Sequence, residues 1–162
     1  MFYIVTTRFS AETFQQNANF RVKYPSVKCI YGSSREMSKC IPPGSLVFVI
    51  EMNNTLNCVE GIGLIRNETR LDKYIRIYES GNFNRYVYRG NYRISREDLD
   101  AQMLEALDHV LFKGRGHLKR GSGFLQIPKI LLKHEKCMNL DMREKIKIMF
   151  KAKFQNTDVT LD

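Results

Sequence analysis

The chain has 162 residues, of which 43% are hydrophobic and 27% are charged, and its formal net charge is +9. This composition excludes wholesale disorder, and a chain of this length can bury a core without disulfides or metal, so we expect one domain over residues 1–154 and a frayed tail over 155–162. It has neither an apolar run of membrane-spanning length nor a secretion signal, so we expect an intracellular protein of the cytoplasm, nucleus or a virion that does not act at a membrane.

The beginning of the chain predicts a strand, a helix and a second strand. The run FYIVTT after Met1 is rich in β-branched and aromatic residues, which is typical of a strand. Ser10 is placed to cap a short helix over residues 11–20, and Tyr24-Pro25 favours an extended or turn conformation beyond it. The segment KCIYGSS, residues 28–34, then predicts a short strand closed by a turn.

Residues 41–65 read IPPGSLVFVIEMNNTLNCVEGIGLI and predict a turn followed by a hairpin. Pro43 and Gly44 fit a tight turn, because proline fixes φ and glycine permits a positive φ at the next position. LVFVIE predicts a strand that is buried on both faces or closed in a barrel, and CVEGIGLI predicts its partner. Gly61 and Gly63 mark a bulge, a barrel corner or the close approach of another backbone or a ligand.

The second half of the chain predicts two more strands and three helices. KYIRIYESG (73–81) and NRYVYRGNYRI (84–94) alternate like strands. Ser95 is the expected N-cap of a helix ending at Phe112, and KGRGHLKRGSG (113–123) predicts a flexible basic loop. FLQIP, residues 124–128, then predicts a short strand or extended piece. KILLKHEKCM, residues 129–138, predicts a helix with Pro128 near its first turn, and residues 140–154 predict a last helix. In the helix that ends at Phe112, the apolar side chains expected to face the core are Leu99, Met103, Ala106, Leu107, Val110 and Leu111.

The order of elements up to residue 65 resembles the PUA-like superfamily, particularly its EVE and YTH branches. In those families a "pGD-vvFy" element leads into a barrel strand and a "GigeV" element follows a hairpin. Here Pro43-Gly44-Ser45, residues 46–50 and residues 61–65 stand at these places, and the likeness extends only loosely to Pro128. The resemblance implies an α+β fold, a small bent β-barrel flanked by helices, with a basic C-terminal helical segment.

The resemblance also implies a function, because members of this group read RNA or DNA and are not generally catalysts. A pocket beside the barrel receives a flipped nucleotide, often a modified base, and the segment before the turn commonly lines it. Here that segment includes Tyr31, Gly32, Ser33 and Ser34. Readers of methylated bases build their cage from tryptophan, which this chain lacks, so a second ring would come from Tyr86, Tyr88 or Tyr92. The alternatives are that Tyr31 packs in the barrel or that the pocket is lost.

Basic residues supply the expected phosphate contacts. Residues 113–153 hold 12 Lys and Arg against 3 Asp and Glu, which favours a surface that faces a polyanion over a generally solvated one. In residues 83–93 arginines interleave with tyrosines, and regular alternation would put the three tyrosines on one face, unless Gly90 breaks the register, as a platform for single strands. The alternative for residues 83–93 is a half-buried strand whose tyrosines pack and whose arginines are only solvated. The alternative for residues 113–123 is a mobile surface loop. The phosphate-binding candidates are Arg89, Arg93, Lys113, Arg115, His117, Lys119 and Arg120.

No constellation of residues predicts catalysis or a metal site. The four cysteines lack zinc spacing, and Asp108-His109 and His134-Glu135 are adjacent on expected helices, which points their side chains apart. We therefore expect no enzyme, cofactor or metal, and a nucleic acid, RNA or DNA, as the partner. The alternative is a structural or packaging protein, such as a virion component of a large DNA virus, that uses the same fold and basic surface. A homodimer is compatible with both.

Overall fold

The computed structural model describes residues 1–155 and residue 161. All but Gln155 and Leu161 of the predicted tail, 155–162, lie outside the described residues. The elements in chain order are β1 (Phe2–Phe9), α1 (Ala11–Lys23), β2 (Cys29–Ser33), β3 (Leu46–Asn53), β4 (Cys58–Arg66), β5 (Tyr86–Gly90), β6 (Tyr92–Ser95), α2 (Ala101–Phe112), β7 (Leu125–Gln126), α3 (Lys129–Leu132) and α4 (Met142–Lys153). The predicted α+β class is confirmed.

A mixed five-stranded sheet lies at the centre, in the order β6-β4-β3-β1-β7. β1 and β3 run parallel, with Phe2 opposite Leu46 and Phe9 opposite Asn53, and β3 continues into the antiparallel hairpin with β4. β2 and β5 form a separate antiparallel ribbon. The carboxyl ends of β1 and β3 therefore meet at one edge of the sheet, beside the start of α1.

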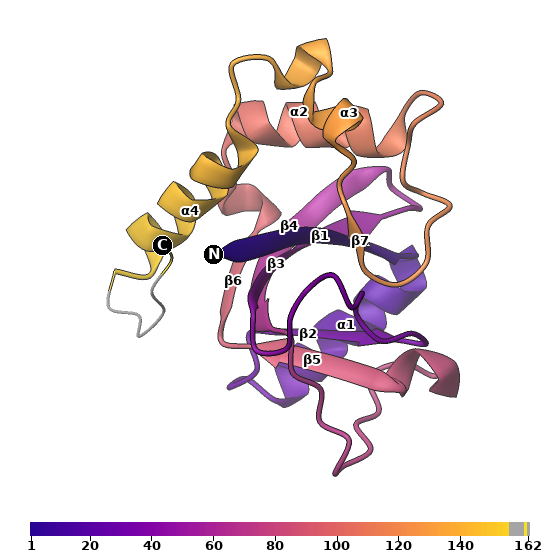
Figure 1. Ribbon diagram of the computed structural model, residues 1–162. Coiled ribbons are helices and arrows are strands. Elements are labelled where there is room, and N and C mark those ends of the chain that lie inside the picture. The colour runs from indigo at the N-terminus through magenta and orange to yellow at the C-terminus, as the bar shows by residue number, and fades with distance from the viewer. Residues whose placement is uncertain (156–160, 162) are drawn as a thin grey trace.

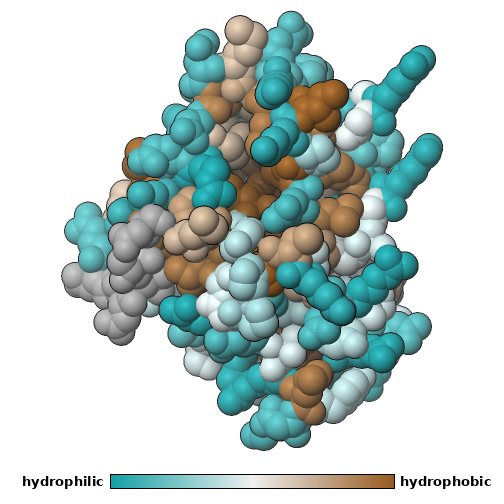
Figure 2. Space-filling view, in the orientation of Figure 1, coloured by the Kyte–Doolittle hydropathy of each residue, from teal (hydrophilic) through white to brown (hydrophobic). Residues whose placement is uncertain are grey.

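The sheet is covered on both faces. Figure 1 shows α2, α3 and α4 on one side of it and the β2–β5 ribbon with α1 on the other. Phe48 and Ile50 of β3 belong to the apolar core under the helices, whereas Val47 and Val49 belong to the core under the ribbon. The prediction that this strand is buried on both faces is confirmed. The exposed face in Figure 2 is mostly hydrophilic, with apolar surface gathered mainly in its upper half, where these helices lie.

The expected closed barrel is not formed by the described strands. β5 and β6 are separated only by Asn91, yet β5 pairs with β2 and β6 pairs with β4. The ribbon lies against the face of the sheet, and glycine at position 90 permits the close approach, since a Cβ there would overlap the carbonyl oxygen of Leu64.

Several local predictions are confirmed and others are wrong. The helix predicted over residues 129–138 is only α3 (Lys129–Leu132), followed by a 3₁₀ turn at Glu135–Cys137. Ser10 caps α1, which runs further than expected, to Lys23, and Gly44 adopts the positive φ of 79° that the turn requires. Residues 73–81 form no strand, and the segment is irregular up to the short 3₁₀ turn at Gly81–Asn84. The N-cap of α2 is Asp100 instead of Ser95, because a 3₁₀ turn occupies residues 96–98. The predicted core stripe of α2 is buried as expected.

Candidate functional site

A cavity of about 390 Å³ opens where β1 and β3 end and α1 begins. Its volume lies within the range of about 300–1,000 Å³ that is common for small-molecule sites. We call it the α1 pocket and define it by its lining residues, Thr7, Arg8, Phe9, Ser10, Thr13, Gly32, Asn54, Thr55, Tyr78 and Phe83.

The start of α1 is fixed to the β3–β4 turn at this pocket. The Ser10 hydroxyl accepts a hydrogen bond from Thr13 N at 3.1 Å, and Thr13 Oγ1 accepts one from Ser10 N at 2.9 Å, which completes a capping box. Ala11 N donates to Thr55 Oγ1 at 2.9 Å. The positive end of the helix dipole therefore lies at the wall of the pocket, where it favours negative or hydrogen-bond-accepting groups.

Two aromatic rings form another wall. Tyr78 and Phe83 pack edge to face, with centroids 6.5 Å apart, and Phe83 remains 46% exposed at the rim. Asn84 holds both rings in place, since its Oδ1 accepts from Ile77 N and Tyr78 N, each at 2.9 Å, and its Nδ2 donates to Tyr78 O at 2.7 Å. Burial raises the pKa of Tyr78, so its hydroxyl stays protonated.

Gly32 allows this wall to approach the ribbon. A Cβ at Gly32 would overlap the carbonyl oxygen of Phe83 and would lie 3.1 Å from the Tyr78 ring. Any larger side chain would push Phe83 away, so the shape of the pocket depends on glycine at this position.

Arg8 is a guanidinium without a carboxylate partner in the described part of the chain. It donates to Thr6 Oγ1 at 3.0 Å, to Leu118 O at 3.4 Å and to Gly123 O, and its Nε has no partner there. Burial lowers the pKa of Arg8 to about 10, because the charged form loses hydration. Arg8 is still protonated near neutral pH and remains an uncompensated positive charge beside the cavity.

Asn54 also has an unused hydrogen-bonding atom. Its Nδ2 donates to Lys119 O at 2.9 Å, while its Oδ1 has no partner. Arg8 Nε and Asn54 Oδ1 are the two buried side-chain polar atoms left without a partner in the described residues. Both atoms are enclosed by protein, so they add polar character to the wall of the cavity but are not themselves exposed to a ligand in it.

The basic loop 113–123 is held beside the α1 pocket. The contacts of Arg8 with the Leu118 and Gly123 carbonyls and of Asn54 with the Lys119 carbonyl tie the loop to the pocket wall. His117 Nδ1 accepts from Lys119 N at 3.2 Å, so both half-buried side chains belong to an ordered turn. The exposed cations of the loop are Lys113, Arg115 and Arg120.

Two predicted site residues lie in an internal polar cluster: Tyr31, predicted to line the base pocket, and Arg93, predicted to bind phosphate. The Tyr31 hydroxyl donates to Glu51 at 2.7 Å, and Arg93 donates to both oxygens of Glu51 at 2.9 and 2.6 Å. Tyr31 is 1% exposed. A Cβ at Gly63 would overlap its hydroxyl, so the close-approach interpretation of this glycine is correct. The packing alternative for Tyr31 therefore holds, and neither side chain faces a ligand.

The other predicted tyrosines do not form one platform. Tyr88 is buried under the ribbon, where its hydroxyl accepts from Met37 N at 2.9 Å, and Tyr86 is half-buried on that side beneath Arg85. Tyr92 packs on the opposite face of the sheet against Phe154, with centroids 5.1 Å apart. The predicted common face is wrong because β5 and β6 belong to different sheets.

The remaining predicted residues divide between the two ends of the sheet. Gly32 lines the α1 pocket, whereas Ser33 is buried and Ser34 is half-buried without lining it. Arg89 is exposed and lines a different cavity at the other end of β3.

Of the ten residues that line the α1 pocket, only Gly32 was predicted as a site residue. The other residues with polar or aromatic contacts of interest are Arg8, Asn54, Thr55, Tyr78 and Phe83. A charged residue within the apolar N-terminal strand, a polar pair directly after the buried strand and Phe83 at the start of the aromatic and arginine run 83–93 were usable signals. Tyr78 gave none, because its segment alternates like a strand.

The described residues contain no group of three or more His, Cys, Asp and Glu side chains that could hold a metal ion. Within the same residues, no helix is both long enough and apolar enough to cross a membrane. No family model, curated protein or solved structure matches the chain significantly.

Proposed function

We propose that the protein binds single-stranded nucleic acid, RNA or DNA, without catalysing a reaction. One base enters the α1 pocket and the neighbouring phosphates contact loop 113–123. The observation that carries this proposal is the position of Arg8, a cation without a carboxylate partner in the described residues, which lines the pocket and also ties the basic loop to it. The resemblance of residues 2–65 to PUA-like readers agrees with it.

The pocket offers the contacts that a flipped base requires. Extruding a base costs a few kcal/mol, and stacking on an aromatic ring returns about 1–3 kcal/mol. Phe83 presents an exposed ring for this contact, and the start of α1 favours a base carbonyl. A pocket with an exposed aromatic ring and a positive wall suits a base better than a purely apolar ligand.

The loop contributes affinity for the phosphates of any strand and does not contribute selectivity for a base. Lys113, Arg115 and Arg120 are exposed on it, and cations that neutralise phosphates release counterions, so binding should weaken steeply as salt rises. Because the loop is tied to the wall of the pocket, a strand whose base is in the pocket brings its adjacent phosphates to these side chains.

The phosphate contacts are tested by charge reversal. Fluorescence anisotropy with labelled short RNA and DNA strands at 50 and 200 mM KCl gives both affinity and salt slope. The triple variant Arg115→Glu, Lys119→Glu, Arg120→Glu should bind at least about 10-fold more weakly. Its slope of log affinity against log salt concentration should be shallower by about 2. The matched control reverses Lys39, Lys133 and Lys151, which are exposed elsewhere. Equal weakening by both triples would contradict the loop assignment.

The base contact is tested by Phe83→Ala in the same assay. Loss of one stacking ring should weaken binding by about 5- to 150-fold and leave the salt slope unchanged. Tyr24→Ala is the control, since Tyr24 is 45% exposed, almost equal to Phe83 at 46%. If the loop variant weakens binding and Phe83→Ala does not, a packaging or structural role with sequence-blind binding replaces base reading.

A further inference from the structure

A second and larger cavity, of about 710 Å³, lies at the opposite end of β3 from the α1 pocket. It is lined by the start of β3, the end of β4, the segment that follows β4 and the junction between β5 and β6. We call it the arginine pocket, after Arg66, Arg70 and Arg89 in its lining. The eight residues of β3 span roughly 25 Å, so a small ligand in one pocket does not reach the other.

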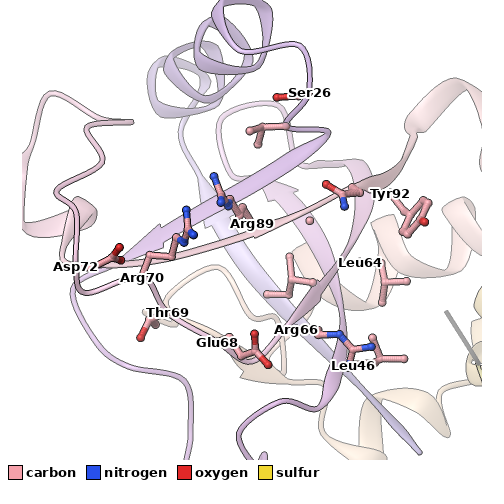
Figure 3. Close-up of a pocket in the computed structure, with 14 residues that line it drawn as sticks. Ser26, Leu46, Leu64, Arg66, Glu68, Thr69, Arg70, Asp72, Arg89 and Tyr92 are labelled. Carbon is pink, nitrogen blue, oxygen red and sulfur yellow. The ribbon is translucent and has the colours of Figure 1, made fainter. Parts of the chain in front are cut away.

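The three arginines are exposed and none of them forms an ion pair within the described part of the chain. Arg66 Nη1 donates to Gly44 O at 3.1 Å. Figure 3 shows Arg70 and Arg89 together on one side of the cavity and Arg66 on the other side, next to Leu46. Since a guanidinium presents several donors in a fixed fork, this arrangement offers many donors to one anion.

Two carboxylates, of Glu68 and Asp72, also line the cavity. Neither lies within 4.0 Å of an arginine nitrogen there, so they do not take up the guanidinium donors. They reduce the net charge of the lining to +1, three arginines against two carboxylates. A ligand with a single concentrated anionic group can still meet the arginine pair, although Figure 3 places Asp72 on the same side of the cavity as that pair.

The rest of the lining is partly apolar. Leu64 is 4% exposed, Leu46 and Tyr92 are half-buried, and the figure places Leu46 and Leu64 away from the arginine pair. The cavity thus has a cationic side, with Arg70 and Arg89, and a mixed side where the leucines lie beside Arg66. A ligand that fills it has an anionic head and an apolar or planar body.

We propose that the arginine pocket binds a phosphate ester of nucleotide size, with the phosphate between Arg70 and Arg89 and the base or sugar against Leu46 and Leu64. Arginine pairs phosphate oxygens bidentately, and a dianionic phosphate uses two guanidinium groups where a carboxylate uses one. The phosphate ester is either a free nucleotide or the terminal phosphate of a strand. This site is independent of the base-binding role of the α1 pocket.

Calorimetric titration tests the proposal with inorganic phosphate, adenosine monophosphate and a short oligodeoxythymidylate with and without a 5′-phosphate. Saturable binding of the monophosphate that the double variant Arg70→Gln, Arg89→Gln weakens at least about 10-fold would support it. The matched control is Arg76→Gln, Arg85→Gln, two exposed arginines outside the cavity, which should change the dissociation constant by less than about 2-fold. No saturable binding of any phosphate ester, or equal loss in both doubles, would overturn it.

The oligonucleotide arms separate the two sources of phosphate and keep this site distinct from the proposed function. A terminal phosphate as the ligand predicts that the 5′-phosphate tightens oligonucleotide binding, and that the gain disappears in the Arg70→Gln, Arg89→Gln variant. A free nucleotide as the ligand predicts tight monophosphate binding with no gain from the 5′-phosphate. Either result must persist in the Phe83→Ala variant, so failure of base reading at the α1 pocket leaves this test intact.

Discussion

At the scale of single residues, the most constrained group is the cluster of Tyr31, Glu51 and Arg93 between the sheet and the ribbon. Sequence reasoning singled out Tyr31 and Arg93 but neither Glu51 nor the contact among the three. Tyr31 was assigned to the base pocket by the resemblance to PUA-like readers, and Arg93 to phosphate as one of the arginines that interleave with tyrosines. Glu51, the acid that removes both from that role, stands 20 and 42 positions away along the chain, where no local pattern relates them.

Glu51→Gln should destabilise the protein by about 3–5 kcal/mol, because it leaves the Arg93 guanidinium buried without its counter-charge. Tyr31→Phe removes one hydrogen bond to a carboxylate that keeps Arg93, so its cost should be smaller, about 1.5–3 kcal/mol. Urea unfolding gives both values. The control is Glu36→Gln at an exposed position, which should change the free energy of unfolding by no more than about 0.5 kcal/mol. A reversed order of the two costs would show that the ion pair is not what stabilises the cluster.

The four free cysteines should differ widely in reactivity. Burial, and next the neighbouring Glu51 charge, raise the pKa of Cys29 to about 12, so at pH 8 only about one thiol in 10,000 is the reactive thiolate. Burial raises the pKa of Cys58 to about 11, and Cys40 is exposed. Alkylation at pH 8 followed by mass spectrometry should modify Cys40 first, and Cys40→Ser should remove the fast phase. Early modification of Cys29 would contradict the buried cluster.

At the scale of elements, the sequence predicted order better than boundaries. β1, α1, β2, β3 and β4 follow the predicted order, since periodic apolar residues and strong caps act locally. Residues 73–81 have the alternation of a strand but pair with no strand, and Asn84 satisfies the backbone of Ile77 and Tyr78. The α1 pocket depends on this irregular segment, which is why its aromatic wall could not be predicted.

The start of α2 illustrates the same limit. Ser95 and Asp100 are both good N-caps, and the choice between them is made by a distant contact: Arg96 donates to Asp108 at 2.8 Å and to Val59 O at 2.8 Å, which holds residues 96–98 in a 3₁₀ turn. Asp100 then caps the helix by accepting from Met103 N at 2.9 Å.

Asp100→Ala should therefore destabilise the protein by about 1 kcal/mol, whereas Ser95→Ala should cost less than about 0.5 kcal/mol, because Ser95 makes no capping hydrogen bond. Asp100→Asn keeps the cap and should retain most of the stability. The pKa of Asp100 is lowered by the Met103 N–H and the Lys145 ammonium, so its contribution is present above the ordinary aspartate pKa and is lost as the pH falls through the lowered value. Urea unfolding at pH 7 and pH 3 measures both effects, and equal costs for the two alanine variants would contradict the cap assignment.

At the scale of the whole molecule, one sheet separates two apolar cores. The continuous apolar run of β3 predicted burial on both faces, but it did not distinguish a closed barrel from a sheet covered on two sides. The pairing of β5 with β2 and of β6 with β4 distinguishes them, and it joins residues far apart along the chain. Because β3 contributes alternate residues to both cores, neither core can lose its packing without disturbing the strand that supports the other.

Phe48→Ala tests this coupling. Phe48 is fully buried on the helical side, packed edge to face on Phe2 and Phe150 with centroids 5.0 and 4.8 Å away, so its loss should cost about 3–5 kcal/mol. The buried tyrosines all lie on the ribbon side, and the chain has no Trp, so near-ultraviolet circular dichroism reports mainly that core. The helical signal comes mostly from α2 and α4, with 12 residues each, and in part from the 13-residue α1 on the ribbon side. A shared strand predicts that both urea transitions move to lower denaturant together. Exposed Ile148→Ala on α4 is the control and should move neither. A tyrosine transition that stays in place while the helical one shifts would show two cores that unfold independently.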